Sequence, residues 1–357
     1  MRKFSLQMEK RNVTRGREIL IRMAAFLLAL AAGAVLIRCN GHSPFFVYAD
    51  MVWGALGRVT FVRETIKAVI PLIIVSTALA ISFRMGFWNI GGEGQMLIGA
   101  AVATSVAIYG ENELPHAVLL LCMCIVAVVG AGIYGAIPAF CKAQWNTNET
   151  LLTLMMNYIA LEFIILLQNT TSWQDPNNAF PQIRALSDNA RLPEVLGIHI
   201  GWIAAPAVLA FYWFYMEHTR HGYEIRVVGD SCATAHYAGI NSKWVIVRSI
   251  FLSAAMCGLA GFIQVSGADG TLSDTTAGGI GFTAIAIVWL AQMKPWEIAI
   301  FSFLIAIMEQ GANRIQTDYQ IPTSFAGLLE GIILLIMMAS AFFINYRVFI
   351  HREEAAV

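Results

Sequence analysis

The sequence predicts an all-α, polytopic integral membrane protein with about ten transmembrane helices. Of its 357 residues, 58% are hydrophobic and 13% are charged, whereas an average soluble domain has about 45–50% apolar and roughly 25% charged residues. The apolar residues are gathered into long runs, and a soluble protein could not bury so much apolar surface and keep a polar exterior. The 23 basic residues balance 23 acidic ones, so we expect no nucleic-acid partner.

Ten apolar runs are candidate spans, since a crossing needs about 20 mostly apolar residues. In chain order they are Ile19–Ile37, Ile66–Ser82, Gln95–Tyr109, Ala117–Phe140, Leu151–Leu167, Gly201–Met216, Val245–Val265, Ile280–Gln292, Trp296–Glu309 and Phe325–Ile344. The first follows a basic stretch, as a signal peptide would, but no small-residue cleavage site follows it, so we expect an uncleaved span. The runs beginning at Gln95, Ile280 and Trp296 are too short for a straight crossing, which predicts broken or half-length helices.

The Lys and Arg residues orient these spans. With the N-terminus inside, the cytoplasmic segments collect more than twice as many of them as the opposite side, which places both termini in the cytoplasm. The resulting regions are a basic cytoplasmic arm (1–18), a transmembrane domain (19–346) and a cytoplasmic tail (347–357). Cys39–Glu64 and Gln168–Ile200 are then soluble segments outside, and Glu217–Trp244 is a cytoplasmic loop (217–244).

No motif for catalysis is present. The chain lacks G-x-x-x-x-G-K-[ST], H-E-x-x-H and G-x-S-x-G, so it has no P-loop with which to hydrolyse ATP. The six Cys show neither zinc-ligand nor disulfide-framework spacing. We therefore expect that the chain is not an enzyme and holds no metal and no cofactor.

A glycine-rich interruption separates two apolar runs at Phe83–Ala100. Asn89, Glu93 and Gln95 lie there among the glycines at 86, 91, 92 and 94, each of which weakens a helix by about 1 kcal/mol relative to Ala. Unwound backbone at membrane depth is typical of binding or translocation sites in transporters; an ordinary cytoplasmic turn explains the composition equally well. A second interruption at Asp274–Thr283 resembles the first, which predicts inverted repeats, although chance explains so weak a similarity as well.

Several acids fall within the apolar runs. Glu162 lies about 16 Å along its predicted helix and hence near the middle of the membrane, where a charge is costly and usually faces protein or water. Glu309 and Glu330 raise the same question nearer the ends of their runs. For each we weigh a buried packing carboxyl against a role in a transport pathway. Arg248, at the start of a run, is expected to extend its charge to the membrane surface.

The cytoplasmic loop 217–244 carries a group of small residues. Gly229, Ala233, Ala235 and Gly239 would let another protein approach closely, and basic and aromatic side chains flank them. The pattern predicts a short helix around Ser231–Tyr237 that ends at Gly239. The alternative is a plain connecting loop.

Together these stretches resemble the permease subunits of bacterial ATP-binding-cassette importers, in the nucleoside and simple-sugar branch of the ribose and branched-chain amino-acid permease group. The matching stretches are F-R-x-G-F-W-N-I-G-G-E-G-Q at Phe83–Gln95, T-N-E-T-L-L-T-L-M-M-N-Y-I-A at Thr147–Ala160, R-H-G-Y-E-I-R-V-V-G at Arg220–Gly229, Y-A-G-I at Tyr237–Ile240 and G-L-A-G at Gly258–Gly261. The resemblance implies a multi-pass protein of the bacterial inner membrane, surrounded by lipid. It also implies three protein partners: a second permease, identical or related, a P-loop ATPase that binds the ATP, and an extracytoplasmic solute-binding protein.

The resemblance also suggests roles for individual residues. The small-residue loop of the family contacts the ATPase, a role that would fall to Gly229, Ala233, Ala235, Gly239 and Ile240. Asn89, Glu93, Gln95 and Asn157 match family positions close to the substrate path, to which Glu162 and Glu330 are added as candidates. The implied solute is a nucleoside or a similar neutral, ring-bearing compound; simple sugars and flavins are alternatives.

Two departures from the family pattern stand out. The polar residue and Pro-Arg that the family commonly carries near Asp230–Cys232 are absent, which leaves the fit to the ATPase open, and Glu330 stands where a neutral Gln is common, which leaves the solute open. A different class of function, an ion-coupled secondary transporter, would use Glu162, Glu309 or Glu330 as a proton site.

Overall fold

A computed structural model describes residues 4–10, 15–111, 113–176, 178, 180–319 and 323–352. Within these ranges, six helices are long and apolar enough to cross a membrane. They are α1 (Arg15–Cys39), α3 (Val59–Arg84), α5 (His116–Trp145), α6 (Glu149–Gln168), α10 (Ser242–Ile263), which continues into the π-helical turn Gln264–Asp269, and α12 (Pro295–Tyr319). The remaining α-helices in the described ranges are α2 (Pro44–Leu56), α4 (Gly92–Gly110), α7 (Gly201–His218), α8 (Arg220–Asp230), α9 (Cys232–Tyr237), α11 (Ile280–Leu290) and α13 (Thr323–Asn345).

Each of the ten predicted runs is helical, which confirms the all-α, polytopic membrane class. The short run at Ile280 is the 11-residue helix α11, as expected. The expected short lengths of the runs at Gln95 and Trp296 are wrong: α4 has 19 residues and α12 has 25. Helix α12 continues past Glu309 because its later turns place Ile315 in a protein core while Arg314 and Asp318 form an i,i+4 ion pair at 2.7 Å.

The chain divides into two compact units, of which unit 1 comprises residues 1–62 and 307–357. Its core consists of buried side chains from α1, α2, α12 and α13: Ile37, Val47, Met51, Ile315 and Leu329. Strand β1 (Phe4–Lys10) pairs antiparallel with β4 (Tyr346–Arg352). Within Cys39–Glu64, which is predicted to be a soluble segment, residues Pro44–Leu56 form the apolar helix α2, and this helix buries Val47 and Met51. Helix α2 contains Asp50 and has 13 residues, fewer than the roughly 20 that a membrane span needs.

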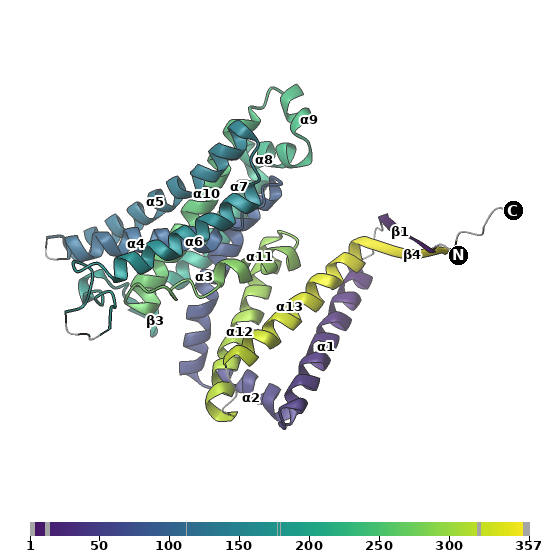
Figure 1. The fold of residues 1–357 in the computed structure, drawn as a ribbon, viewed down its shortest axis with the longest axis horizontal. Helices are drawn as coiled ribbons and strands as arrows, with labels where there is room; N and C mark the ends of the chain where they lie inside the picture. Colours follow the sequence, from purple (N-terminus) through teal and green to yellow (C-terminus); the bar gives the residue numbers. More distant parts are fainter. Residues whose placement is uncertain are drawn as a thin grey trace. The chain divides into compact units, whose positions relative to one another are not determined.

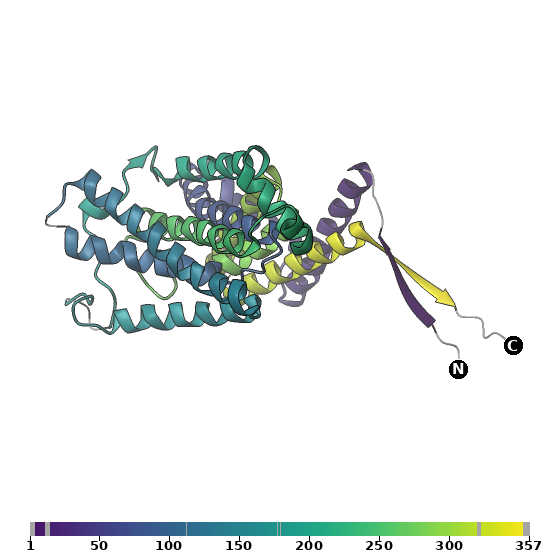
Figure 2. The ribbon, with the colours of Figure 1, turned by 90° about the horizontal axis from the view of Figure 1, so that it is seen from above.

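Unit 2 comprises residues 63–306. Helix α3 forms its centre, since every residue from Val69 to Phe83 is buried. Helix α10 packs closely along α4 and α5 (Figures 1 and 2). Glycines permit this approach: a Cβ on Gly258 would lie 2.5 Å from the carbonyl oxygen of Ala127 in α5, and one on Gly261 would lie 2.8 Å from the backbone nitrogen of Ala100 in α4.

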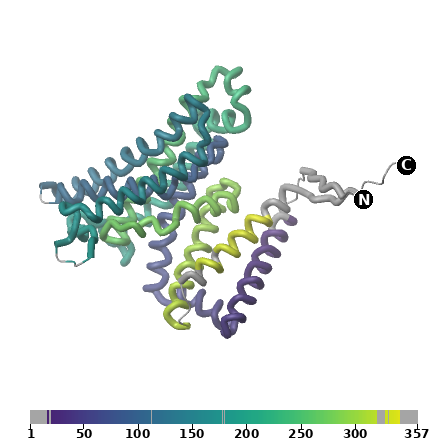
Figure 3. The backbone as a smooth tube through the Cα atoms, in the orientation of Figure 1, coloured from purple at the N-terminus to yellow at the C-terminus, as the bar shows by residue number. Residues whose placement is uncertain are grey.

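The two ends of unit 2 carry different loops. A two-residue turn at Leu196 and Gly197, both with positive φ (61° and 79°), joins β2 (Glu194–Val195) to β3 (Ile198–His199). Helix α7 connects this hairpin directly to α8, so the hairpin and α8 lie about 27 Å apart along an 18-residue helix. Figure 3 traces this path from the loop that contains β3 to the segment that contains α8 and α9.

Candidate functional site

The predicted glycine-rich interruption is a real break between α3 and α4. Helix α3 ends at Arg84, the chain turns at Gly86 with φ +76°, and α4 begins at Gly92. Asn89 lies in the break and is fully buried. An unwound backbone leaves N–H and C=O groups without helical partners, and where such groups are buried they need other partners inside the protein.

An amide in the break and an amide in the first turn of α4 bind each other. The Nδ2 of Asn89 donates to Oε1 of Gln95 at 3.2 Å, and the Nε2 of Gln95 donates to Oδ1 of Asn89 at 3.1 Å. The same Oδ1 accepts a hydrogen bond from the backbone nitrogen of Gly91 at 3.0 Å. Gln95 is 2% exposed, so both amides are held inside the protein.

Helix α6 supplies the other partners of the broken backbone. The Oδ1 of Asn157 accepts from the backbone nitrogen of Gly94 at 2.9 Å, and its Nδ2 donates to the carbonyl of Ile90 at 2.8 Å. Thr153, one turn earlier, accepts from the backbone nitrogen of Ile90 at 3.2 Å. Gly94 is required here because a Cβ would lie 2.9 Å from the Cα of Asn157. We call Asn89, Gln95, Thr153 and Asn157 the amide clamp.

Glu93 joins the two glycine-rich interruptions. Its Oε1 accepts from the backbone nitrogen of Gly279 at 2.8 Å and its Oε2 from that of Gly281 at 2.6 Å. These N–H groups belong to the start of α11, where a carboxylate is favoured by unpaired donors and by the helix dipole. The contact is close, since a Cβ on Gly281 would lie 2.7 Å from the Cα of Glu93. The relation of the two interruptions as inverted repeats remains a prediction.

The structure thus brings together four of the six predicted pathway residues: Asn89, Glu93, Gln95 and Asn157. Their polar atoms bind the chain itself, and their contact with a solute remains a prediction. Glu162 lies on an exposed face of α6, separate from the clamp. Glu330 lies in α13, and its side chain falls outside the described part. Thr153 lies four residues before Asn157 and hence on the same face of α6, but its bond to Ile90 had no sequence signal.

The cytoplasmic loop predicted at 217–244 contains two helices, α8 and α9, at one end of unit 2 (Figure 1). The expected short helix is confirmed as α9: Ser231 caps its start by accepting from the backbone nitrogen of Thr234 at 3.3 Å, and Gly239 follows its end with φ +72°. Helix α8 was not expected. Ala233 and Gly239 are exposed, Ile240 is half-buried and Ala235 is buried. Tyr237 projects with 92% of its surface exposed.

Gly229 occupies a different position from the other small residues of this segment. Gly229 packs against the end of α3. A Cβ on Gly229 would overlap the carbonyl oxygen of Arg84 and lie 3.2 Å from the carbonyl carbon of Met85. The α8–α9 segment therefore touches the chain immediately before the break between α3 and α4.

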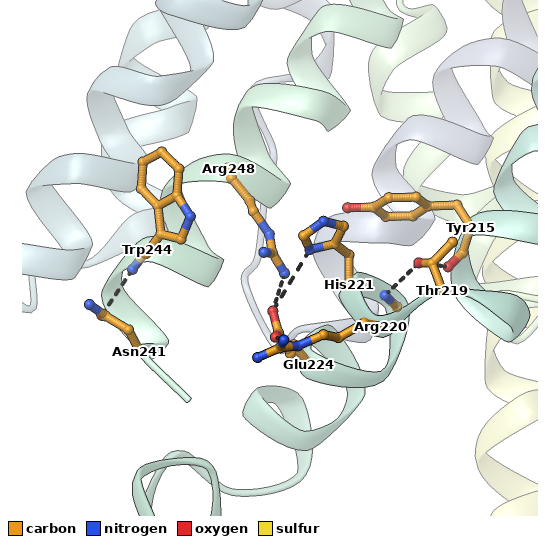
Figure 4. A network of polar contacts seen from close by, with 9 residues as sticks. Tyr215, Thr219, Arg220, His221, Glu224, Asn241, Trp244 and Arg248 are labelled. Atoms are coloured by element: carbon orange, nitrogen blue, oxygen red, sulfur yellow. Dashed lines mark hydrogen bonds and ion pairs between the residues drawn. The ribbon is translucent and has the colours of Figure 1, made fainter. Parts of the chain in front are cut away.

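A buried carboxylate anchors α8, as Figure 4 shows. The Nη2 of Arg248 in α10 donates to Oε2 of Glu224 at 2.6 Å, and the Nε of Arg220 donates to Oε1 at 2.9 Å. The Nδ1 of His221 lies 3.8 Å from Oε2. Burial raises the pKa of Glu224, but the hydrogen bonds and charges of Arg248 and Arg220 outweigh it and hold the pKa below its usual range. The expected extension of Arg248 to the membrane surface stays a prediction; the structure shows that its guanidinium is paired with Glu224.

At the opposite end of unit 2, the loop between α6 and α7 folds against the segment that follows α10. The backbone nitrogen of Leu186 donates to Gly270 at 2.8 Å, and Oγ1 of Thr271 donates to Ile183 at 3.0 Å. Between these segments lies a cavity of about 410 Å³, lined by Gln168, Asp175, Asn178, Pro181, Gln182, Ile183, Ala185 and residues 271–275. Its polar lining contains amides, hydroxyls and two carboxylates.

Comparison with known proteins gives one family for most of the chain. Residues 61–338 match the model of the branched-chain amino acid transport system / permease component family. The chain is 31% identical to the guanosine ABC transporter permease protein NupP of Bacillus subtilis over 92% of its length and 95% of the relative's. It is 29% identical to the glucose ABC transporter permease protein TsgB13 of Haloferax volcanii (90% and 87%) and 23% identical to the probable riboflavin import permease protein RfuC of Treponema pallidum (88% and 84%).

Proposed function

The chain belongs to the family of permease components of branched-chain amino acid transport systems, and from this premise we propose that it imports a nucleoside or a similar neutral, ring-bearing solute. It is the multi-pass permease subunit of an ATP-binding-cassette importer. The names of its relatives contain guanosine, glucose and riboflavin, and these three compounds are the solute classes considered. Among these the nucleoside is favoured by the relative with 31% identity over 95% of its own length.

The docking surface for the ATPase is formed by α9 and the turn after it. The observation that supports this is the exposure of Ala233, Tyr237 and Gly239 together at one end of unit 2. Small residues let a partner's backbone approach, and an exposed aromatic side chain is a common anchor at protein interfaces. ATP is bound and hydrolysed by that partner, since this chain has no P-loop sequence.

The remaining partners and the orientation follow from the same proposal. A second permease, identical or related, completes the translocation pathway, and an extracytoplasmic binding protein delivers the solute to the end of unit 2 opposite α9. Both chain termini and residues 217–244 lie in the cytoplasm, in agreement with the distribution of Lys and Arg.

Two matched glycine variants test the docking surface. Gly239→Arg places a long side chain at an exposed position with φ +72° and open space around it; Gly41→Arg does the same at an exposed position with φ +81°. We expect the wild-type chain and Gly41→Arg to co-purify with a P-loop ATPase, and Gly239→Arg to lose it. Full assembly and ATP-driven uptake by Gly239→Arg would refute the assignment of the surface.

The solute is tested by uptake in cells that carry the complete importer. Radiolabelled guanosine, glucose and riboflavin are supplied separately, with a strain that lacks the permease as the control. ATP-dependent accumulation of guanosine alone supports the nucleoside assignment. Accumulation by the purified chain in liposomes under an ion gradient, without ATP or partners, would refute the importer mechanism.

A further inference from the structure

The ion pair between Glu224 and Arg248 joins the proposed docking segment to the helix bundle of unit 2. Helix α8 carries α9 at its C-terminal end, and only Ser231 separates the two helices. The side chains of Glu224 and Arg248 are 11% and 17% exposed, and they meet at 2.6 Å. A short, charge-assisted hydrogen bond between largely buried groups fixes their relative position more firmly than an exposed ion pair does.

The other partners of Glu224 hold it less firmly. The side chain of Arg220 is 88% exposed and lies on α8 itself, so its bond does not tie α8 to another helix. His221 is also on α8 and lies 3.8 Å away. Arg248 is therefore the partner through which Glu224 connects α8 to α10.

Helix α10 is in turn packed backbone to backbone against its neighbours. A Cβ on Gly258 would lie 2.5 Å from the carbonyl of Ala127 in α5, and one on Gly261 would lie 2.8 Å from the nitrogen of Ala100 in α4. Closely packed helices move together because such interfaces have little room to slide. The first turn of α4 contains Gln95, which bonds Asn89 in the break, and Glu93, which bonds the start of α11. A displacement of Arg248 is thereby carried to the break.

We propose that Glu224 and Arg248 are positioning residues that transmit movement of the ATPase from the α8–α9 segment, through α10, to the break between α3 and α4. This inference rests on the proposed function. It separates two roles in one segment: the surface of α9 binds the ATPase, whereas the Glu224–Arg248 pair passes the movement on. Loss of the pair uncouples ATP hydrolysis from transport and leaves the partner bound.

The test uses the complete importer, with its ATPase and binding protein, in proteoliposomes. Four variants break, shorten or reverse the pair: Glu224→Gln, Arg248→Gln, Glu224→Asp and the double charge swap Glu224→Arg with Arg248→Glu. Glu297→Gln is the matched control, because it also removes a carboxylate from an ion pair, with Lys294 at 2.8 Å, outside the docking segment and the clamp. Co-purification of the ATPase, ATP hydrolysis and guanosine uptake are measured for each, and size-exclusion profiles select folded protein.

We expect both Gln variants to keep the ATPase bound and to lower the number of solute molecules moved per ATP by about tenfold, within the range of measured coupling between sites. Glu224→Asp keeps the charge and retains most of the coupling, the charge swap regains part of it, and Glu297→Gln equals the wild type. Unchanged coupling in both Gln variants overturns the inference, as does a parallel fall in hydrolysis and uptake. Failure of the wild-type chain to bind any ATPase would instead overturn the proposed function.

Discussion

Replacing Asn157 tests how much the amide clamp contributes to the free energy of unfolding. Asn157→Leu keeps the branched side chain with the same number of heavy atoms, but the backbone nitrogen of Gly94 and the carbonyl of Ile90 lose their bonds of 2.9 Å and 2.8 Å. A buried polar group left without a partner costs about 1–3 kcal/mol, hence about 2–6 kcal/mol for two. Measured hydrogen bonds between membrane helices average about 0.6 and reach about 1.7 kcal/mol, hence about 1–3 kcal/mol for two. We expect a loss of about 2–3 kcal/mol, where these ranges overlap.

Equilibrium unfolding of the purified chain in mixed detergent micelles measures this loss. Asn169→Leu is the control, since Asn169 is exposed at the end of the same helix and bonds only its own helix, with Nδ2 donating to the carbonyl of Ile165 at 2.8 Å. Water can replace that bond, so the control should change the free energy of unfolding by less than about 0.5 kcal/mol. An equally small change in Asn157→Leu would refute the role of Asn157 in holding the break.

Three further predictions use the same assay. Gly281→Ala forces a Cβ to within 2.7 Å of the Cα of Glu93 and should destabilise the protein and slow uptake. The control Gly331→Ala lies in α13 with open space around it and should be neutral or stabilise the protein by up to about 1 kcal/mol. Equal effects of the two substitutions would contradict the close packing at Gly281. Glu93→Gln should cost about 2 kcal/mol, because it removes a charge from a helix start and one of two acceptors; a neutral result would speak against the cap. Because the pKa of Glu224 is lowered in the folded state, its contribution is complete above the unfolded-state pKa of about 4.3 and is lost as the pH falls through the lower folded-state pKa. The stability difference between wild type and Glu224→Gln should therefore stay constant from pH 7 to about 5 and shrink below about 4; shrinkage above pH 5 would contradict this.

Hydropathy predicted the helices but not all their ends. The ten runs can be recognised because the apolar composition of each is a local property that does not depend on tertiary contacts. Helix α2 was missed because it is short and contains Asp50, although Pro44 at its first turn is a recognised helix start. The end of α12 was placed too early because a polar turn can continue a helix when one face remains buried, as Ile315 does here.

The candidate site was predicted as separate stretches and not as contacts. Asn89 and Gln95 stood out by their glycine-rich surroundings, and Asn157 by the resemblance. These residues meet only because α6 packs against α4. Gly94 and Asn157, which share a hydrogen bond, are 63 residues apart in the sequence, and no local sequence pattern predicts such a contact. The pairing of Arg248 was not predicted for the same reason: its partner Glu224 lies 24 residues earlier in a segment whose fold was not foreseen.

The chemistry of the break bears on what drives transport. The alternative of a proton-coupled carrier calls for an acidic side chain at the site that can exchange a proton. Glu93 is a carboxylate at the break, and both of its oxygens accept backbone N–H groups at the start of α11. Glu162 is exposed about 140° around α6 from Asn157, at 100° per residue. The clamp itself consists of neutral amides and a hydroxyl that satisfy one another and the backbone. The polar groups described at the break are thus bonded to the protein itself, and the α8–α9 segment touches the chain beside the break at Arg84. This arrangement favours a mechanical input over an ion gradient as what rearranges the break.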